Sequence, residues 1–213
     1  LRMKSNLTNF INQFAKKEEI PEWKLHEHKK IRGGSLAIVI GDFWEVLSKL
    51  QSFIDDAKRN KNKPVDLMML ITYQIKQELE SLKSLDKFEA KIGCKVWEGY
   101  LNSERENYEI NVDSLRIFQY QSARGLEGWT TFLMNFDEFY ENQIKDLNEK
   151  YHTLQGVSQA IDEWVMTEIN RWLMMILTRS IDTTIIHFKN EESEIFKKIS
   201  FYSKKYPDFI SLI

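Results

Sequence analysis

The side chains best suited to chemistry lie in a glycine-containing loop between two apolar runs. The loop, residues 121–128, reads Gln-Ser-Ala-Arg-Gly-Leu-Glu-Gly and follows the apolar run Leu115–Tyr120. A second β-rich run, Trp129–Phe136, leaves it. Loops that hold Ser, Arg and Glu between buried strands are where α/β proteins place ligand-binding groups. The sequence therefore predicts a ligand loop at the carboxyl edge of a parallel sheet, with an ordinary connection containing two turn glycines as the alternative.

Four charged groups are expected at strand ends, and they are Arg2, Arg124, Glu127 and Arg179. A guanidinium pairs its fork of N–H groups with phosphate oxygens, so arginines at a sheet edge suit a phosphorylated ligand. The carboxylate of Glu127 could accept hydrogen bonds from sugar hydroxyls. The motifs GxxxxGK[ST], GxGxxG and GxSxG do not occur. The groups present therefore predict half of a nucleotide site, which something else must complete.

Composition narrows the class of protein. Hydrophobic residues make up 42% of the 213 and charged residues 29%, and the net charge of −2 gives no general attraction to nucleic acid or membrane. Cys94 is the single cysteine, which excludes an internal disulfide and predicts a reducing, cytoplasmic setting. No apolar run reaches membrane-spanning length and no signal peptide opens the chain, so no membrane association is expected. The first residue is Leu, which suggests a piece of a longer polypeptide.

Buried strands are expected to alternate with amphipathic helices. Continuous apolar runs predict strands at residues 35–41, 66–72, 115–120, 129–136 and 183–188, with a possible short strand at 94–97. Apolar spacing predicts helices at residues 1–17, 43–60, 73–85, 158–179 and 191–206, and an acidic helix starting at 137. Strands without polar alternation are typical of sheets buried on both faces. The sequence thus predicts an α/β fold, a mostly parallel sheet with helices on both faces, forming one domain over residues 1–213.

Local signals predict how some elements are fixed. Ser5 or Asn6 could cap the N-terminal helix, and Asp42 could cap the helix that follows the first strand. His187 lies in the last predicted strand, where a partnered core histidine is the expected role. Cys94 is expected to pack in the core rather than act as a nucleophile, because no histidine lies near it in sequence.

Several weaker patterns leave alternatives open. His26 and His28 alternate in a polar connector, which favours a solvated linker over a metal site. Trp23 stands among lysines that could contact a nucleic-acid backbone. The acidic run 137–141 could bind Mg²⁺, although the helix dipole explains acidic residues in a first turn more simply.

A nuclease alternative rests on Glu89 and Lys91 with Asp66 upstream. This arrangement would need a pair of metal-binding carboxylates presented from a strand. The sequence around Glu89 instead predicts the end of a helix or a loop, which disfavours the nuclease.

Three segments resemble motifs of the superfamily-1 helicases of the UvrD/Rep kind. Residues 121–127, QSARGLE, resemble motif V, usually written HSAKGLE, and residues 168–180, EINRWLMMILTRS, resemble motif VI, EERRLLYVALTRA. Residues 1–6, LRMKSN, resemble the motif IV region, NYRSxxxI. The segments follow the family order, and the spans between them suit the second RecA-like domain. The resemblance covers nearly the whole chain and implies a RecA-like domain of the P-loop NTPase kind, without its own Walker A motif.

The resemblance implies a role for each motif residue at a site for ATP with Mg²⁺. Arg179 would be the arginine finger that stabilises charge on the γ-phosphate, and Arg2 would be a second γ-phosphate contact. Glu127 would meet the ribose, with Gly125 shaping the turn beside Arg124.

The same resemblance implies contact with DNA. Gln121 and Ser122 would face single-stranded DNA or the end of a DNA duplex, and Arg171 would brace the motif VI helix. The chain departs from the family pattern at three positions, with Gln121 in place of His, Arg124 in place of Lys and Met174 in place of Tyr. These departures bear more on contact with DNA than on contact with the nucleotide.

The function implied is the C-terminal half of an ATP-dependent DNA helicase or translocase. The Walker lysine, the DExx carboxylates and the N-terminal RecA-like domain lie outside this chain, so the chain alone is not expected to hydrolyse ATP. One alternative is a degenerate helicase-like module with an interaction or regulatory role. Another is an independent α/β enzyme that uses Glu127 and Arg124.

Overall fold

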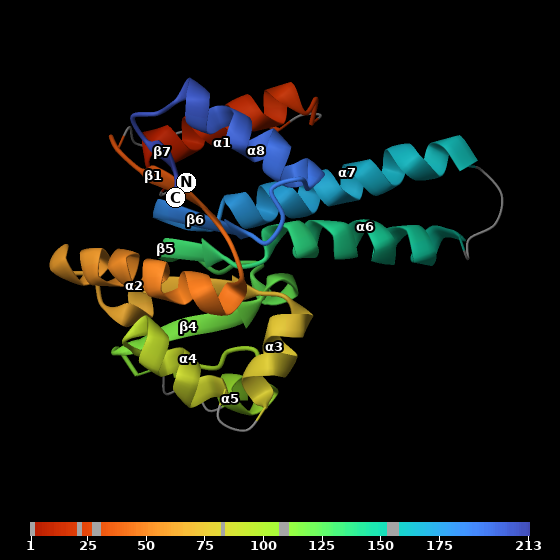
Figure 1. Ribbon diagram of the computed structural model, residues 1–213. Helices are drawn as coiled ribbons and strands as arrows, with labels where there is room; N and C mark the ends of the chain where they lie inside the picture. The colour runs from red at the N-terminus through yellow and green to blue at the C-terminus, as the bar shows by residue number, and fades with distance from the viewer. Residues whose placement is uncertain (1–2, 21–22, 27–30, 82–83, 107–110, 153–157) are drawn as a thin grey trace.

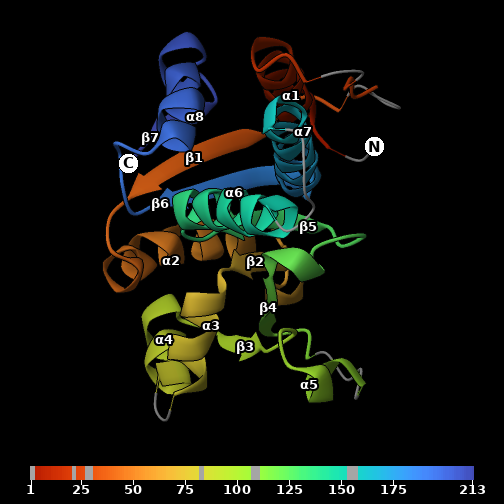
Figure 2. The same ribbon diagram turned by 90° about the vertical axis from the view of Figure 1, so that its right-hand side faces the viewer.

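All strands of the computed structural model belong to one parallel sheet (Figures 1 and 2). The structure describes residues 3–20, 23–26, 31–81, 84–106, 111–152 and 158–213. The strand order is β3-β4-β2-β5-β6-β1-β7, and every pairing in it is parallel. The strands are β1 Ser35–Ile40, β2 Leu67–Ile71, β3 Lys95–Trp97, β4 Ser114–Gln119, β5 Gly128–Leu133, β6 Ser180–Phe188 and β7 Ile210–Leu212.

Helices cover both faces of this sheet. They are α1 Ser5–Lys17, α2 Phe43–Arg59, α3 Tyr73–Glu80, α4 Ser84–Ile92, α5 Asn102–Glu106, α6 Phe136–His152, α7 Ser158–Leu177 and α8 Glu194–Lys205, with 3₁₀ turns η1 Pro64–Asp66 and η2 Tyr120–Ser122. The long helices α6 and α7 lie side by side and extend beyond the sheet (Figure 1). Within the described residues, no helix is long and apolar enough to cross a membrane. The expected α/β fold with a parallel sheet is confirmed.

Alternate residues of each strand build two separate cores. In β2, Met68 and Leu70 pack under α1, α6, α7 and α8, whereas Leu67, Met69 and Ile71 pack under α2, α3 and α4. All five side chains are fully buried. Burying an apolar side chain of this size contributes about 1.5–3 kcal/mol. Burial on both faces is why these strands read as continuous apolar runs rather than alternating ones.

Two helix starts show how local signals compete with tertiary contacts. Asp42 caps α2 as expected, since its Oδ1 accepts a 2.9 Å hydrogen bond from the N–H of Trp44. The predicted cap of α1 is wrong, because the helix begins after Lys4 without a side-chain cap. Its first N–H groups, those of Ser5 and Asn6, instead donate to the carbonyls of Ile31 and Gly33 at 2.9 Å. A neighbouring chain segment therefore satisfies donors that a cap usually serves.

Several predicted boundaries differ from the structure at strand ends. The last predicted strand starts earlier, at Ser180, because residues 180–183 extend its pairing with β5. The predicted helix 73–85 ends as α3 at Glu80, and Phe136 begins a helix rather than ending a strand. The short edge strand β7 was not predicted, since three residues are too few to show a pattern.

The connection from β4 to β5 crosses the sheet. Gln119, the last residue of β4, pairs with the last residue of β2, whereas Thr130 of β5 pairs with Leu67, the first. Residues 120–127 therefore run from the carboxyl edge back to the amino edge. The prediction that this whole loop lies at the carboxyl edge is wrong, because only its first residues do.

His187 fixes the carboxyl edge from inside the core. The fully buried ring accepts a 3.1 Å hydrogen bond at Nδ1 from the N–H of Asn135, and Nε2 donates to the carbonyl of Gly41 at 2.8 Å. The prediction of a partnered core histidine is confirmed. Burial lowers the pKa of His187 below its ordinary 6.5, and the hydrogen bond with Gly41 opposes this shift.

This lowered pKa predicts a loss of stability in acid. Because the unfolded chain binds a proton at His187 more readily, the free energy of unfolding should fall as the pH drops through 6.5. The fall should end once the pH is below the folded-state pKa of His187. Chemical denaturation between neutral pH and mild acid measures it. The variant His187→Gln should lose this component, whereas His26→Gln, at an exposed position, should keep it; equal slopes in the two variants would contradict the assignment.

Candidate functional site

Arg179 lies between the end of α7 and the start of β6, at the amino edge of the sheet. Its Nε donates to the carbonyl of Met175 at 2.8 Å, and Nη2 donates to the hydroxyl of Thr178 at 3.1 Å. Nη1 reaches across to the loop and donates to the carbonyl of Leu126 at 3.2 Å. The side chain therefore closes the last turn of the helix and also holds the loop that precedes β5.

A second arginine, Arg116 of β4, holds the same loop one residue further on. Its Nη2 donates to the carbonyl of Glu127 at 2.9 Å. Burial lowers the pKa of Arg116, and the nearby carboxylate of Asp66 opposes this shift. Sequence reasoning missed this residue. The available signal was a single arginine inside an otherwise apolar strand.

The electrostatics at Arg179 favour an anionic ligand. Burial lowers its pKa, and the carboxylate of Glu127 opposes this shift. Arginine stays protonated in proteins, so this half-buried guanidinium is a partly desolvated charge. Each of its terminal nitrogens carries two N–H groups, and the bonds to described residues use one of each. Two N–H groups thus remain for oxygens of a ligand such as phosphate.

Gly125 lies at the turn of the loop with a φ of +81°. A Cβ added there would meet no atom within 4 Å, so the conformation and not the space requires glycine. Arg124, Gly125 and Glu127 are all exposed. Arg124 lines a depression of about 310 Å³ beside α7, together with Glu168, Arg171, Trp172 and Met175. There Arg171 forms an ion pair with Glu168.

Gln121 and Ser122 lie at the opposite, carboxyl edge. Gln121 is exposed and lines a cavity of about 280 Å³ that includes Thr72, Tyr73 and Tyr120. The chain leaves β2 towards the face of α3, whereas it leaves β5 towards the face of α6. Such a change of direction marks the place where open α/β sheets bind ligands. The predicted site residues therefore fall into two groups at opposite edges of the sheet.

The described residues hold donors for phosphate but not ligands for a metal ion. Among them, no group of three or more His, Cys, Asp or Glu side chains could hold a metal. Asp137, in the acidic first turn of α6, is buried and accepts the N–H groups of Lys189 and Asn190 at 3.0 and 2.8 Å. Arg2 and His28 lie outside the described residues, so their predicted roles rest on sequence. The N–H groups of Arg179 suit phosphate oxygens.

The other residues considered as functional candidates have structural roles in the fold. Glu89 lies within the helix α4, which was not predicted, and not on a strand; its Oε1 accepts the N–H of Val96 at 2.9 Å. Burial raises the pKa of the Cys94 thiol to about 11, so Cys94 is not a thiolate at neutral pH. Trp23 packs against the core on the α1 side of the sheet.

Comparison with known proteins identifies the fold. No protein-family model matches the chain, and no curated protein matches it. Among solved structures, the chain is similar to the C-terminal domain of a possible DNA helicase from Lactobacillus plantarum WCFS1. The TM-score is 0.55 at 11% sequence identity, and the match covers 99% of this chain and 97% of that one. The chain has the α/β fold of that solved domain.

Replacing Arg116 tests how the loop is held. The variant Arg116→Met loses the bond to the Glu127 carbonyl, worth about 1 kcal/mol. Amide hydrogen exchange in residues 124–128 should therefore become about fivefold faster. Arg59→Met, at an exposed position on α2, is the matched control and should leave this exchange unchanged. Exchange in the loop that is equally slow in both variants would show that Arg116 does not hold it.

Proposed function

We propose that this chain is the C-terminal RecA-like domain of an ATP-dependent DNA helicase or translocase of the UvrD/Rep type. In this proposal residues 1–213 form one domain of a cytoplasmic enzyme. The domain supplies Arg179 to an ATP site that an N-terminal RecA-like domain completes, in the same polypeptide or in another chain. The similar solved domain, from a possible DNA helicase, supports the proposal at the level of fold.

The observation that carries the proposal is the contact between Arg179 and the loop. The two segments that resemble motifs V and VI are far apart in sequence, yet Arg179 bonds to the carbonyl of Leu126. The backbone N–H of Gly128 also donates to the carbonyl of Arg179 at 3.0 Å. The side chain proposed to contact the phosphate, Arg179, and the one proposed to contact the ribose, Glu127, thus lie at the same edge of the sheet. In hydrolysis, Arg179 would stabilise charge on the γ-phosphate, while the other domain would hold Mg²⁺.

Contact with single-stranded DNA is assigned to the carboxyl edge. Gln121 and Ser122 begin the loop there, and the cavity beside Gln121 has the exposed aromatic side chain of Tyr73 at its wall. An aromatic ring and amide groups suit unstacked bases. Because one loop joins this edge to Arg179, nucleotide binding and DNA binding would be coupled through it.

A second candidate is a helicase-like interaction module without ATPase activity. The observation that favours it is that all three guanidinium nitrogens of Arg179 already bond to their own chain. In this case Arg179 is a clamp between α7 and the loop and contacts no nucleotide.

Kinetics of the full polypeptide distinguish the two candidates. With single-stranded DNA present, Arg179→Ala should lower the kcat for ATP hydrolysis on the order of 10³-fold or more. Arg179→Lys keeps the charge but loses the fork, so it should also be strongly impaired. The control is Lys197→Ala, an exposed cation on α8. Activity within a few-fold of wild type in Arg179→Ala would reject the finger.

A further inference from the structure

A polar cavity of about 440 Å³ opens at the amino edge of the sheet. It lies near Arg179 and Glu127, which together are called the half-site. The cavity lies where β1, β5 and β6 begin and where α2 ends. The lining comes from five separate segments: Lys4, Ser35, Phe53, Asp56, Ala57, Asn60, Asn62, Trp129, Thr130, Asp182 and Thr183. Its volume is within the range of small-molecule sites, about 300–1,000 Å³.

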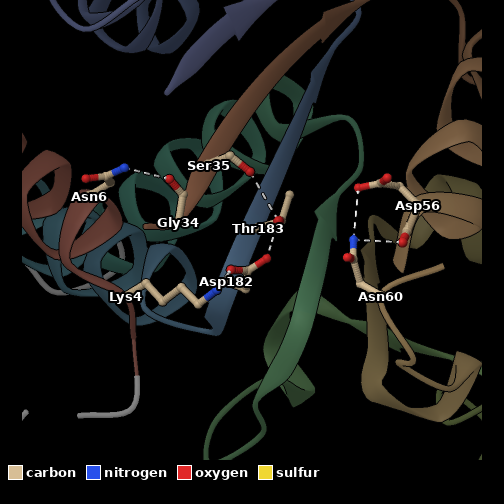
Figure 3. A network of polar contacts seen from close by, with 8 residues as sticks. All are labelled: Lys4, Asn6, Gly34, Ser35, Asp56, Asn60, Asp182 and Thr183. Atoms are coloured by element: carbon tan, nitrogen blue, oxygen red, sulfur yellow. Dashed lines mark hydrogen bonds and ion pairs between the residues drawn. The ribbon is translucent and has the colours of Figure 1, made fainter. Parts of the chain in front are cut away.

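Part of the cavity wall is held in place by a polar network (Figure 3). Lys4 forms an ion pair with Asp182, whose Oδ2 accepts a 2.9 Å hydrogen bond from the hydroxyl of Thr183. The hydroxyls of Thr183 and Ser35 lie 3.1 Å apart. The backbone N–H of Lys4 also donates to the carbonyl of Ile181 at 2.9 Å. These contacts fix the wall before any ligand arrives, which lowers the entropic cost of binding.

The charge of the lining disfavours phosphate. Two carboxylates, Asp56 and Asp182, stand against one ammonium, Lys4, which is already paired. The remaining polar side chains include hydroxyls and the amides of Asn60 and Asn62. The Nδ2 of Asn60 already donates to the carbonyl and the carboxylate of Asp56, so Asn60 offers its Oδ1 as an acceptor. The amide of Asn62 can both donate and accept. A neutral ligand with several donors and acceptors therefore suits the cavity better than an anion does.

Aromatic side chains supply the apolar part of the lining. Trp129 is half-buried, and the Nζ atom of Lys4 lies 5.1 Å from the centroid of its ring. Phe53 of α2 is also half-buried and lines the same cavity. A flat, polar-edged ring such as a nucleobase combines the aromatic contact with the hydrogen bonds that this lining offers.

The cavity adjoins the half-site along two neighbouring strands. Trp129 follows Glu127 by two residues, and Asp182 follows Arg179 by three. Strands β5 and β6 pair with each other here, so the arginine and the cavity occupy adjacent positions on one edge. A ligand with an anionic end and a neutral aromatic end could therefore span both.

We propose that this cavity receives the nucleobase of the nucleotide whose phosphates meet Arg179. The inference rests on the proposed function for the identity of the whole ligand, but the cavity can be tested by itself. The base contacts Trp129, and the Oδ1 of Asn60 and the amide of Asn62 bond to its edge. This domain then contributes to the choice of base as well as to the stabilisation of phosphate charge.

Binding of two ligand fragments to the 213-residue chain tests the proposal. Adenosine carries a base without phosphate, and tripolyphosphate carries phosphate without a base. In NMR titrations at millimolar concentrations, adenosine should shift the indole signal of Trp129 and the side-chain amide signals of Asn60 and Asn62. Tripolyphosphate should shift the Nε signal of Arg179 and leave Trp129 unchanged. Adenosine that shifts none of the cavity signals would overturn the proposal.

Substitutions then locate the binding. Trp129→Leu should raise the dissociation constant of adenosine about tenfold or more, the usual effect of losing base stacking. The matched control is Trp44→Leu on α2, outside the cavity, which should stay within a factor of two. Asn62→Ala removes one polar contact and should weaken adenosine binding about fivefold; Asn148→Ala is its control. Unchanged affinity in both cavity variants would overturn the proposal, and Asn62→Ala decides it if Trp129→Leu does not fold.

The results separate this inference from the proposed function. If Arg179→Ala removes ATPase activity but adenosine leaves the cavity signals unchanged, the function stands and the cavity assignment is wrong. If adenosine binds in the cavity while Arg179→Ala keeps full activity, the cavity assignment stands and the arginine finger is wrong.

Discussion

The site depends on how residues 120–127 return across the sheet without an α-helix. A parallel connection usually contains a helix whose apolar face fixes it. Here buried anchors and polar bonds take that role. At the carboxyl edge Tyr120 is fully buried, and its hydroxyl donates to the carbonyl of Met134 at 2.8 Å. At the amino edge Arg179 and Arg116 donate to two consecutive carbonyls of the loop. The loop is thus held at both ends, with its exposed turn between them.

This arrangement gives a physical route between the two edges. An anion bound at the remaining N–H groups of Arg179 would draw the guanidinium towards itself and so weaken its bond to the Leu126 carbonyl. The loop can respond at Gly125, whose left-handed backbone is strained for any other residue. Tyr120 holds the other end of the loop in place. A changed path of the loop would therefore alter the position of the next residue, Gln121. Coupling by this route would need no contact between a ligand at Arg179 and a ligand at Gln121.

Sequence patterns predicted the elements better than the contacts that join them. The fully buried β2 reads as a continuous apolar run, and α1 shows its buried face at helical spacing, so both were predictable. The start of β6 was not, because Ser180 and the polar residues after it carry no strand pattern. Arg116 was missed since its partner is a backbone carbonyl, which leaves no trace in sequence. The cavity could not be predicted either, because its lining comes from five segments that are far apart in the sequence.

One strand register places the half-site and the cavity together. Gly128 pairs with Ser180, and its N–H bonds to the carbonyl of Arg179. The residues just before this pair, Glu127 and Arg179, are therefore neighbours. After a register shift Thr130 pairs with Thr183, and both of these residues line the cavity. A shift of one residue would move every side chain of the strand to the other face. Such a shift would also bring a residue with a Cβ to the position of Gly128. A Cβ there would lie 2.9 Å from the Cβ of Met68, so the packing opposes the shift. The geometry of both sites therefore follows from backbone pairing, which the side chains of either site alone could not set.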